Sequence, residues 1–202
     1  MDRTLFKSVN EQELNRAFYK ANNYLQKNHY IQTEQKELET FIEFYTIIFK
    51  ELADIEIDND TIKAISEDTV YNDEKFIFYD DVFEYIPLFS KDYKLGIVSD
   101  TWPSLERVFR SNNLRNYFST FIMSSKLGVW KPDKLMFNTA LNELNMKPDE
   151  VLFIDDSIKN VEGAMKLGIQ SILMNRDNRI NKENIDILSV NNLEELYILM
   201  NK

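Results

Sequence analysis

The segment that most constrains the fold runs from Val151 to Gly168 and reads VLFIDDSIKNVEGAMKLG. Its first four residues are apolar and predict a buried strand that ends on the adjacent carboxylates Asp155 and Asp156. A helix is expected from about Lys159, and Gly168 is placed to end it. This order of strand, acidic pair, loop and helix puts the two carboxylates at the C-terminal edge of a parallel sheet, where open α/β folds bind ligands.

The acidic pair has two interpretations. Two like charges at such an edge favour a bound cation, most simply Mg²⁺, because a hard metal ion offsets their repulsion. Acidic residues are also favoured at helix N-caps and in first helical turns, so Asp155 and Asp156 are equally consistent with a cap on the following helix. The segment by itself leaves both open.

Composition limits the class of protein. A chain of 202 residues with 44% hydrophobic residues suits one globular α/β domain, with or without a small insertion. The formal charge of −10 and a pI near 4.7 disfavour nucleic acid and anionic membranes as partners. The absence of cysteine excludes disulfides and thiolate metal sites and fits a cytoplasmic protein. The opening MDRTLFKSVNEQEL lacks the apolar core of a signal peptide, and no apolar run is long enough to cross a bilayer.

The chain divides into two regions of different periodicity. Residues 8–90 contain no glycine and carry apolar residues at helical spacing, with polar loops expected at 54–60 and 68–74. From Lys94 onward, short apolar runs alternate with helical patterns, which predicts right-handed βαβ units and a parallel sheet. The expected strands are 95–98, 121–123, 151–154 and 171–174, followed by a last helix at 193–200.

Two further polar side chains follow strands of the predicted sheet. Ser99 comes after the strand 95–98, where a hydroxyl and the N–H groups of a helix start can bind an anion. Lys131 precedes a helix that Pro132 is expected to open. Taken singly, Ser99 is an ordinary N-cap and Lys131 a solvated surface lysine. Together with the acidic pair they supply the hydroxyl, the cation and the metal ligands that a phosphate group needs.

Three stretches resemble, in order and spacing, motifs II, III and IV of the haloacid dehalogenase-like hydrolases: IVSD at 97–100, Lys-Pro-Asp at 131–133 and FIDDSIKNVEGAMKLG at 153–168. The resemblance covers about residues 79–176. It implies a Rossmann-like parallel sheet with a helical cap inserted between motifs I and II. In position, 8–78 corresponds to the cap and 79–202 to the α/β hydrolase core.

The resemblance also implies roles for the motif residues. In the family's phosphatases the motif II hydroxyl and the motif III lysine hold the phosphoryl group. This assigns phosphate binding to Ser99, with its neighbour Asp100, and both phosphate binding and catalysis to Lys131. The motif IV acids bind Mg²⁺: Asp156 matches the usual direct ligand, and Asp155 is a second acid that supports the metal or its waters.

Motif I departs from the family pattern. The family has a buried strand ending in Asp-x-Asp-Gly-Thr-Leu, in which the first Asp attacks phosphorus and the second is the general acid/base. The chain opens MDRTLF, which matches from the second Asp onward with Arg3 at the glycine position. In this register residues 1–7 are a remnant of motif I, Asp2 is the acid/base and a metal ligand, and the nucleophile falls one position before Met1.

Other interpretations of this end stay open. A second register makes Asp2 the nucleophile and Thr4 the acid/base position, but it puts Leu5 at the glycine site. A third treats the opening residues as a terminus unrelated to motif I.

In the favoured register the first strand, normally central in the sheet, is absent, and its two neighbours lose their hydrogen-bonding partner. Three explanations are open. In the first, further residues precede Met1, and in the second, the chain is a shortened, inactive form that folds with a gap or a borrowed strand. As a third explanation, another segment replaces the strand, and KFIFYDD at 75–81 has the apolar character for it.

The resemblance implies a Mg²⁺-dependent phosphatase that hydrolyses a small phosphorylated metabolite through an aspartyl-phosphate, as a monomer or homodimer. A dehalogenase of the same family would not need the metal, so the acidic pair favours phosphatase chemistry. The alternative is an inactive relative that keeps the scaffold and has a binding or structural role. His29, the only histidine, is expected to be structural or solvated.

Overall fold

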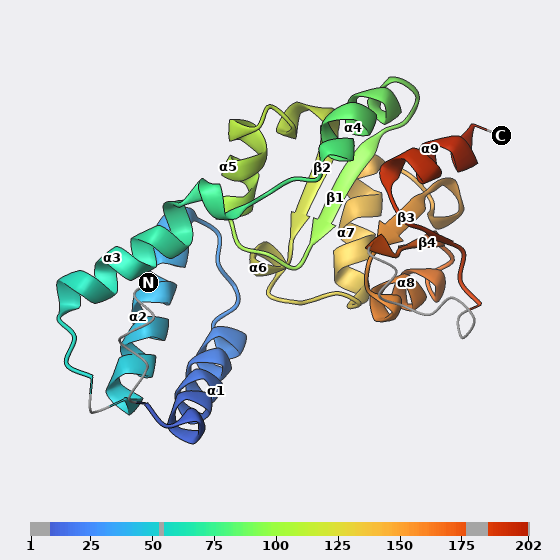
Figure 1. Ribbon diagram of the computed structural model, residues 1–202. Helices are drawn as coiled ribbons and strands as arrows, with labels where there is room; N and C mark the ends of the chain where they lie inside the picture. Colours follow the sequence, from blue (N-terminus) through green and yellow to red (C-terminus); the bar gives the residue numbers. More distant parts are fainter. Residues whose placement is uncertain (1–8, 53–54, 177–185, 202) are drawn as a thin grey trace.

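In the computed structural model the chain forms a helical unit and an α/β unit (Figure 1). The helical unit comes first in the sequence, and the α/β unit contains all the strands of the described chain. No helix within the described ranges is long and apolar enough to cross a membrane. These ranges are 9–52, 55–176 and 186–201.

Three helices make up the helical unit: α1 (Glu11–Lys27), α2 (Glu34–Glu51) and α3 (Asn59–Tyr71). Each begins after a residue whose side chain accepts a backbone N–H group of the first turn, which satisfies a donor that the helix leaves free. Their apolar faces bury a core that includes Ala17, Phe41 and Ile48. The helical spacing of this part of the sequence is therefore confirmed as helix.

The third helix is longer than the sequence pattern indicates. The polar composition of 68–74 predicts a loop, which is wrong for its first half: α3 continues to Tyr71, and a 3-10 turn covers Asp73–Lys75. Val70 is only 1% exposed and packs in the core of the helical unit. Its burial extends the helix, because tertiary packing contributes more than local polarity to helix stability.

The α/β unit alternates helices and strands. Every strand expected from the apolar pattern is present, with ends that differ by a few residues, and the short β5 is one that the pattern does not predict. The elements are α4 (Asp80–Asp92), β1 (Leu95–Ser99), α5 (Ser104–Ser111), β2 (Phe118–Met123), α6 (Ser124–Leu127), α7 (Lys134–Leu144), β3 (Leu152–Asp155), α8 (Ile158–Met165), β4 (Gln170–Met174), β5 (Ser189–Val190) and α9 (Leu193–Met200).

All paired strands are parallel, and they form two sheets. One sheet pairs β1 with β2, and the other has the order β3-β4-β5. Among the described residues no backbone hydrogen bond joins β1 to β3. The expected α/β class, with parallel strands and a helical N-terminal region, is confirmed.

Helices cover both faces of the strands. On one face α7 and α8 pack on the strands, with Phe137, Ala164 and Phe153 in one shared cluster. On the other face α4 and α9 pack against each other and on the second sheet, where Phe89 and Leu196 meet Ile172. This three-layer arrangement explains why the strands read as continuous apolar runs, since parallel strands are covered on both faces.

The connection before α7 differs from its prediction. The sequence predicts that Pro132 opens this helix, which is wrong. α7 begins at Lys134 and its N-cap is Asp133, whose side chain accepts the Leu135 N–H at 2.8 Å. Pro132 instead packs against α8: a Cβ built at Gly163 would lie 2.3 Å from its Cβ. Contact with a distant helix, rather than helix initiation, determines where this proline lies.

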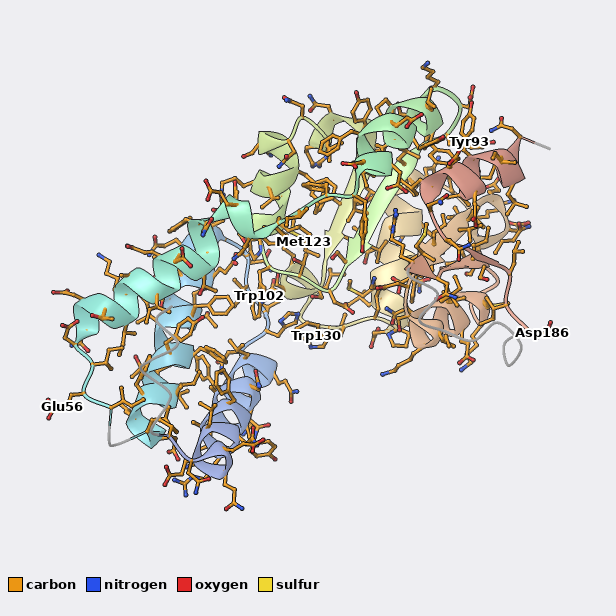
Figure 2. All side chains as sticks on the ribbon, viewed as in Figure 1. Glu56, Tyr93, Trp102, Met123, Trp130 and Asp186 are labelled. Atoms are coloured by element: carbon orange, nitrogen blue, oxygen red, sulfur yellow. The ribbon has the colours of Figure 1, made fainter. Side chains whose placement is uncertain are left out.

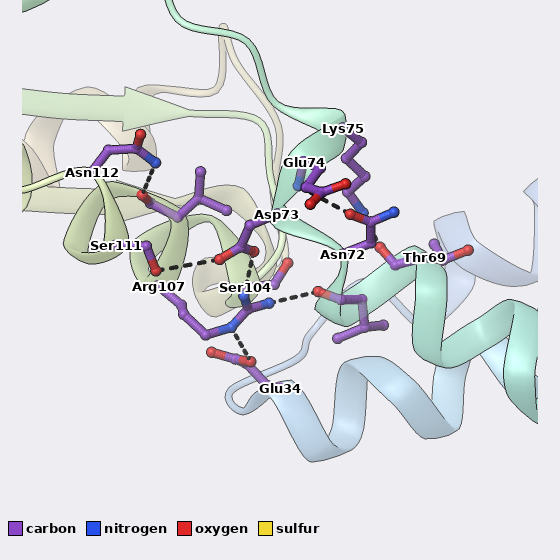
Figure 3. Close-up of polar contacts among 12 residues, drawn as sticks. Glu34, Thr69, Asn72, Asp73, Glu74, Lys75, Ser104, Arg107, Ser111 and Asn112 are labelled. Atoms are coloured by element: carbon purple, nitrogen blue, oxygen red, sulfur yellow. Dashed lines mark hydrogen bonds and ion pairs between the residues drawn. The ribbon is translucent and has the colours of Figure 1, made fainter.

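Polar contacts join the helical unit to α5 (Figure 3). Arg107 of α5 donates to Glu34 of α2 at 2.9 Å, to the Val70 carbonyl at 2.7 Å, and to Asp73. In addition, Glu37 of α2 accepts both the backbone N–H and the hydroxyl of Ser104 at the start of α5, at 2.9 and 2.7 Å. These contacts fix one end of the helical unit beside the sheet.

Candidate phosphate and metal site

Lys131 contacts one strand of each sheet. Its Nζ donates to the Val98 carbonyl at the end of β1, at 2.9 Å, and to Asp155 Oδ2 at the end of β3, at 2.6 Å. The side chains of Lys131 and Asp155 are only 9% and 7% exposed. The interpretation of Lys131 as a solvated surface lysine is therefore wrong.

Asp100 fixes the loop that carries this lysine. Its Oδ1 accepts the backbone N–H of Lys131 at 2.8 Å. Ser99, directly before Asp100, is the last residue of β1. Lys131 Nζ also lies 5.8 Å from the centroid of the Phe153 ring, and this cation–π contact helps to position the lysine. The structure thus brings Ser99, Asp100 and Lys131, all predicted phosphate-site residues, to one edge of the strands.

Both carboxylate oxygens of Asp155 have hydrogen-bond partners. One oxygen holds Lys131, and the other accepts the Ser157 backbone N–H at 2.9 Å and the Asn160 amide at 3.0 Å. The second set of contacts orients the first turn of α8, where the dipole favours a negative charge. Asp156 is the exposed carboxylate of the pair.

A cavity of about 880 Å³ lies between β1 and β3, and we call it the β1–β3 cleft. Ser99, Asp155 and Asp156 line it at the C-terminal ends of the strands. Most of its remaining lining is apolar and comes from the two strands and from α4 and α9. The candidate site therefore occupies one end of a much larger cavity.

The donor set suits a hard cation only in part. Within the described residues no cluster of three or more His, Cys, Asp or Glu side chains could hold a metal ion. Mg²⁺ commonly takes one or two carboxylates and completes its shell with water and phosphate oxygens, so Asp156 with Asp155 behind it fits that chemistry. Asp2, the predicted acid/base and third metal-binding acid, lies outside the described residues.

An aromatic cluster that the sequence motifs do not predict lies beside Lys131. The His29 ring stacks on Trp130 at a centroid distance of 3.5 Å and meets the edge of Trp102 at 5.0 Å. Figure 2 shows both tryptophans where the helical unit faces the α/β unit. Trp102 lies two residues after Asp100, and Trp130 directly precedes Lys131. Their closeness in sequence to these motif residues is the one sign of the cluster that the sequence offers.

His29 is structural, as expected, rather than solvated. It is 2% exposed, and its Nε2 lies 2.9 Å from the Ser124 hydroxyl of α6. Its Nδ1 is buried and has no hydrogen-bond partner in the described structure. Burial lowers the pKa of His29 to about 4, so the ring is neutral at pH 7.

Sequence comparison gives two informative relatives. Glyceraldehyde 3-phosphate phosphatase of Methanopyrus kandleri is 28% identical over 116 residues, which are 52% of this chain and 48% of that protein. Pyrimidine 5′-nucleotidase YjjG of Escherichia coli is 30% identical over 110 residues, 51% of this chain and 49% of that protein. The chain spans about half the length of the curated relatives it matches.

Structure comparison extends over nearly the whole chain. The putative hydrolase YfnB of Bacillus subtilis, solved with magnesium, has a TM-score of 0.65 at 21% identity and covers 99% of this chain and 89% of its own. A 2-haloacid dehalogenase of Pseudomonas syringae has a TM-score of 0.68 at 15% identity, with 98% and 84% covered. At these identities the likeness establishes the fold alone.

A family model decides the membership. The model described as haloacid dehalogenase-like hydrolase matches residues 1–174, well over half of the chain. The match includes the helical unit, the strands that end at Ser99 and Asp155, and the loop that carries Lys131. The protein is a member of the haloacid dehalogenase-like hydrolases.

Proposed function

We propose that the protein is a Mg²⁺-dependent phosphomonoester hydrolase that acts on a small phosphorylated metabolite. The observation that carries this proposal is the buried ammonium group of Lys131, held between the Val98 carbonyl and Asp155 at the rim that also holds Ser99 and Asp156. The two curated relatives described above are named for action on a sugar phosphate and on nucleotides, which supports a phosphorylated substrate.

Lys131 and Ser99 bind the phosphoryl group in this proposal. The two acceptors of Lys131 hold its charge in a fixed position, so little reorganisation is needed when negative charge develops on the phosphoryl oxygens. Asp100 keeps the lysine loop in place through the Lys131 backbone N–H. The Ser99 hydroxyl is a further donor to the same group.

Asp156, supported by Asp155, would hold Mg²⁺, which supplies charge stabilisation to the phosphoryl oxygens. Asp2 is proposed as the general acid/base that protonates the leaving alkoxide and then activates water. A carboxylate one position before Met1 is proposed as the nucleophile, which attacks phosphorus and forms an aspartyl-phosphate.

The helical unit is proposed to act as a cap that selects the substrate. Residues 8–78 would form this cap, 79–202 the hydrolase core, and 1–7 the remnant of motif I. The proposal is supported by His29 of the α1–α2 loop. Its ring stacks on Trp130, the residue directly before Lys131. A side chain of the helical unit is thereby placed next to the phosphate-binding loop.

The test measures Mg²⁺ and inorganic phosphate binding by calorimetry. Replacing Asp156 by Asn should weaken Mg²⁺ binding by about tenfold or more, and replacing Lys131 by Met should weaken phosphate binding by about 10- to 100-fold, since a charged hydrogen bond is worth about 1.5–3 kcal/mol. The exposed Asp149→Asn and Lys134→Met are matched controls and should bind as the unchanged chain does. Unchanged affinity in the Asp156 or Lys131 variant would refute its assignment.

Hydrolysis is tested with an aryl phosphate and Mg²⁺, for the 202-residue chain and for a form extended at its N-terminus. Turnover in the extended form is expected. Turnover in neither form contradicts the enzyme proposal and favours the second candidate, a phosphate-binding relative without catalysis. That candidate is supported by the open β1–β3 cleft beside the site.

A further inference from the structure

We infer that the helical unit holds residues 99–104, which we call the β1–α5 loop, in the shape that binds phosphate, and that Ser124 is the positioning residue at the junction. Ser124 acts through the backbone of this loop, which carries Ser99 and Asp100, and not by contact with substrate. The inference rests on the proposed phosphate-binding role of Ser99. It gives the helical unit a task besides the selection of substrate.

The hydroxyl group of Ser124, the first residue of α6, joins the two units of the molecule. The Thr101 backbone N–H donates to Ser124 Oγ at 2.9 Å, and Ser124 Oγ donates to the Thr101 carbonyl at 3.2 Å. His29, from the connection between α1 and α2, places its Nε2 at 2.9 Å from the same Oγ. One buried oxygen therefore bonds both to the β1–α5 loop and to the helical unit.

The hydrogen-bonding capacity of these groups assigns a direction to each bond. A hydroxyl group has one proton to donate and two lone pairs that accept. Because Ser124 Oγ donates to the Thr101 carbonyl, it accepts from His29, which then carries its proton on Nε2. The buried Nδ1, without a partner among the described residues, is in this tautomer an acceptor, and unpaired acceptors are commoner in protein interiors than unpaired N–H groups. The Ser124 hydroxyl thus spends its whole bonding capacity on joining the two units.

The helical unit also contacts the β1–α5 loop directly. The Trp102 side chain packs against the apolar core of the helical unit and meets the Phe41 ring edge-on at a centroid distance of 5.4 Å. Figure 2 shows Trp102 where the two units face each other. Two residues further on, Ser104 donates its backbone N–H and its hydroxyl to the buried Glu37 carboxylate. The loop is therefore anchored at three of its residues, Thr101, Trp102 and Ser104.

These anchors directly follow the residues of the candidate phosphate site. Ser99 and Asp100 precede Thr101, and Asp100 accepts the Lys131 backbone N–H at 2.8 Å. A shift of the Thr101 backbone would carry the Ser99 hydroxyl with it and would loosen the loop of Lys131. Donors stabilise charge best when they are already in place before the charge arrives. The affinity for phosphate should therefore depend on the anchors.

His29 contacts both loops of the site. It reaches the β1–α5 loop through Ser124, and its ring stacks on Trp130, the residue directly before Lys131. The two loops lie far apart in the sequence, but one side chain of the helical unit is packed between them. Displacement of the helical unit would thus be transmitted to both loops at once.

The neighbouring serine provides a matched control for Ser124. Ser125 also lies in α6 and is equally buried, but its Oγ has no hydrogen-bond partner in the part of the chain that the structure describes. The change Ser125→Ala therefore removes a buried hydroxyl without removing an anchor of the loop.

The first test measures the binding of inorganic phosphate and of Mg²⁺ by calorimetry, with circular dichroism to verify that each full-length variant is folded. Ser124→Ala should weaken phosphate binding by about tenfold, because it removes the bonds that hold Thr101, and should leave Mg²⁺ binding at Asp156 unchanged. Ser124→Thr keeps the hydroxyl and should recover most of the affinity. Ser125→Ala should bind both ligands as the unchanged chain does. Equal phosphate affinity in the two alanine variants would overturn the inference.

The second test follows the loop itself and needs no ligand. Amide hydrogen exchange at Thr101 should be about tenfold or more faster in His29→Ala than in the unchanged chain, although His29 reaches Thr101 only through Ser124. Exchange at the paired amides of β1 and β2 should stay the same and serves as the internal control. Since the variant alters only the helical unit, equal exchange at Thr101 would contradict the inference even if Ser124→Ala does not fold.

The two tests together separate this inference from the proposed function. Faster exchange at Thr101 in His29→Ala, combined with no phosphate binding by the unchanged chain, supports the coupling of the helical unit to the loop and contradicts the proposed phosphate site. Phosphate binding that Ser124→Ala leaves unchanged supports the proposed site and contradicts the positioning role of Ser124.

Discussion

The Asp155 carboxylate bonds to Lys131 through one oxygen and to the start of α8 through the other. It pairs with the buried ammonium of Lys131 through Oδ2 and orients the start of α8 through Oδ1. Such a buried pair contributes little relative to an apolar pair of the same shape, but removing one partner leaves the other charge buried and unpaired. The position of the lysine therefore depends on the aspartate as much as on its own loop.

Replacing Asp155 by Asn should lower the free energy of unfolding by about 3 kcal/mol, measured by urea denaturation. Replacing Lys131 by Met in the same chain should recover part of this loss, because no buried charge is then left unpaired. The exposed pair of Lys36 and Glu39 provides the control, and Glu39→Gln should leave the midpoint unchanged. Strictly additive effects of the two changes at Lys131 and Asp155 would contradict the coupling.

At the scale of elements, α8 and the lysine loop are in direct contact. Gly163 lets the helix approach Pro132, and the absence of a Cβ at this point permits the close packing. Because Pro132 directly follows Lys131, the packing of α8 also sets the position of the lysine. A glycine inside a helix is normally unfavourable, by about 1 kcal/mol relative to alanine.

Gly163→Ala should therefore lower the stability by about 1–3 kcal/mol despite its better helix propensity, because the new Cβ overlaps the proline ring. Phosphate affinity should fall with it, since the loop of Lys131 must move. Thermal unfolding and calorimetry measure the two effects. The exposed neighbour Glu162, replaced by Ala, should stay within about 0.5 kcal/mol of the unchanged chain. A more stable Gly163 variant would contradict this account.

At the scale of the whole molecule, a few contacts join the helical unit to α6. His29 meets Ser124 at 2.9 Å, the Ile31 backbone N–H donates to the Ser125 carbonyl at 2.8 Å, and Gln32 donates to the Lys126 carbonyl at 2.8 Å. All three come from the short connection between α1 and α2. The protonation of His29 is therefore linked to how the two units hold together.

Acid should destabilise the protein through His29. Its pKa is about 4 when folded, lowered by burial, against an ordinary value of 6.5. As the pH falls from 6.5 toward 4, the unfolded chain takes up a proton that the folded chain does not, so the free energy of unfolding falls. The loss from this group is about 2 kcal/mol at pH 5 and stops below about pH 4, where both states are protonated.

The measurement is urea unfolding between about pH 7.5 and pH 5, compared with His29→Gln, whose amide can hydrogen-bond to Ser124 in either direction but does not titrate in this range. The variant should lose less stability over the interval. Glu37, whose pKa is raised by burial and by nearby Glu34 against the lowering effect of Ser104, acts in the opposite direction and is present in both proteins. Parallel pH profiles for the two proteins would show that His29 is not responsible.

Local patterns were sufficient to predict most elements and the edge on which the site lies. Apolar runs followed by polar residues predict strand ends, and parallel strands bring those ends to one edge, so Ser99, Lys131 and Asp155 could be expected there. The extension of α3 through Val70 and the role of Pro132 could not be predicted, because each depends on a partner far along the chain.

The alternation of strands and helices, the helical region before it and the residues at the strand ends all follow from residue periodicity within short windows, so they could be predicted without a structure. Three features became visible in the folded chain alone: Asp155 holds Lys131, His29 stacks on Trp130, and a cavity of about 880 Å³ lies between β1 and β3. Each of these depends on which surfaces meet across long sequence separations, and that is settled by packing and burial of the whole chain.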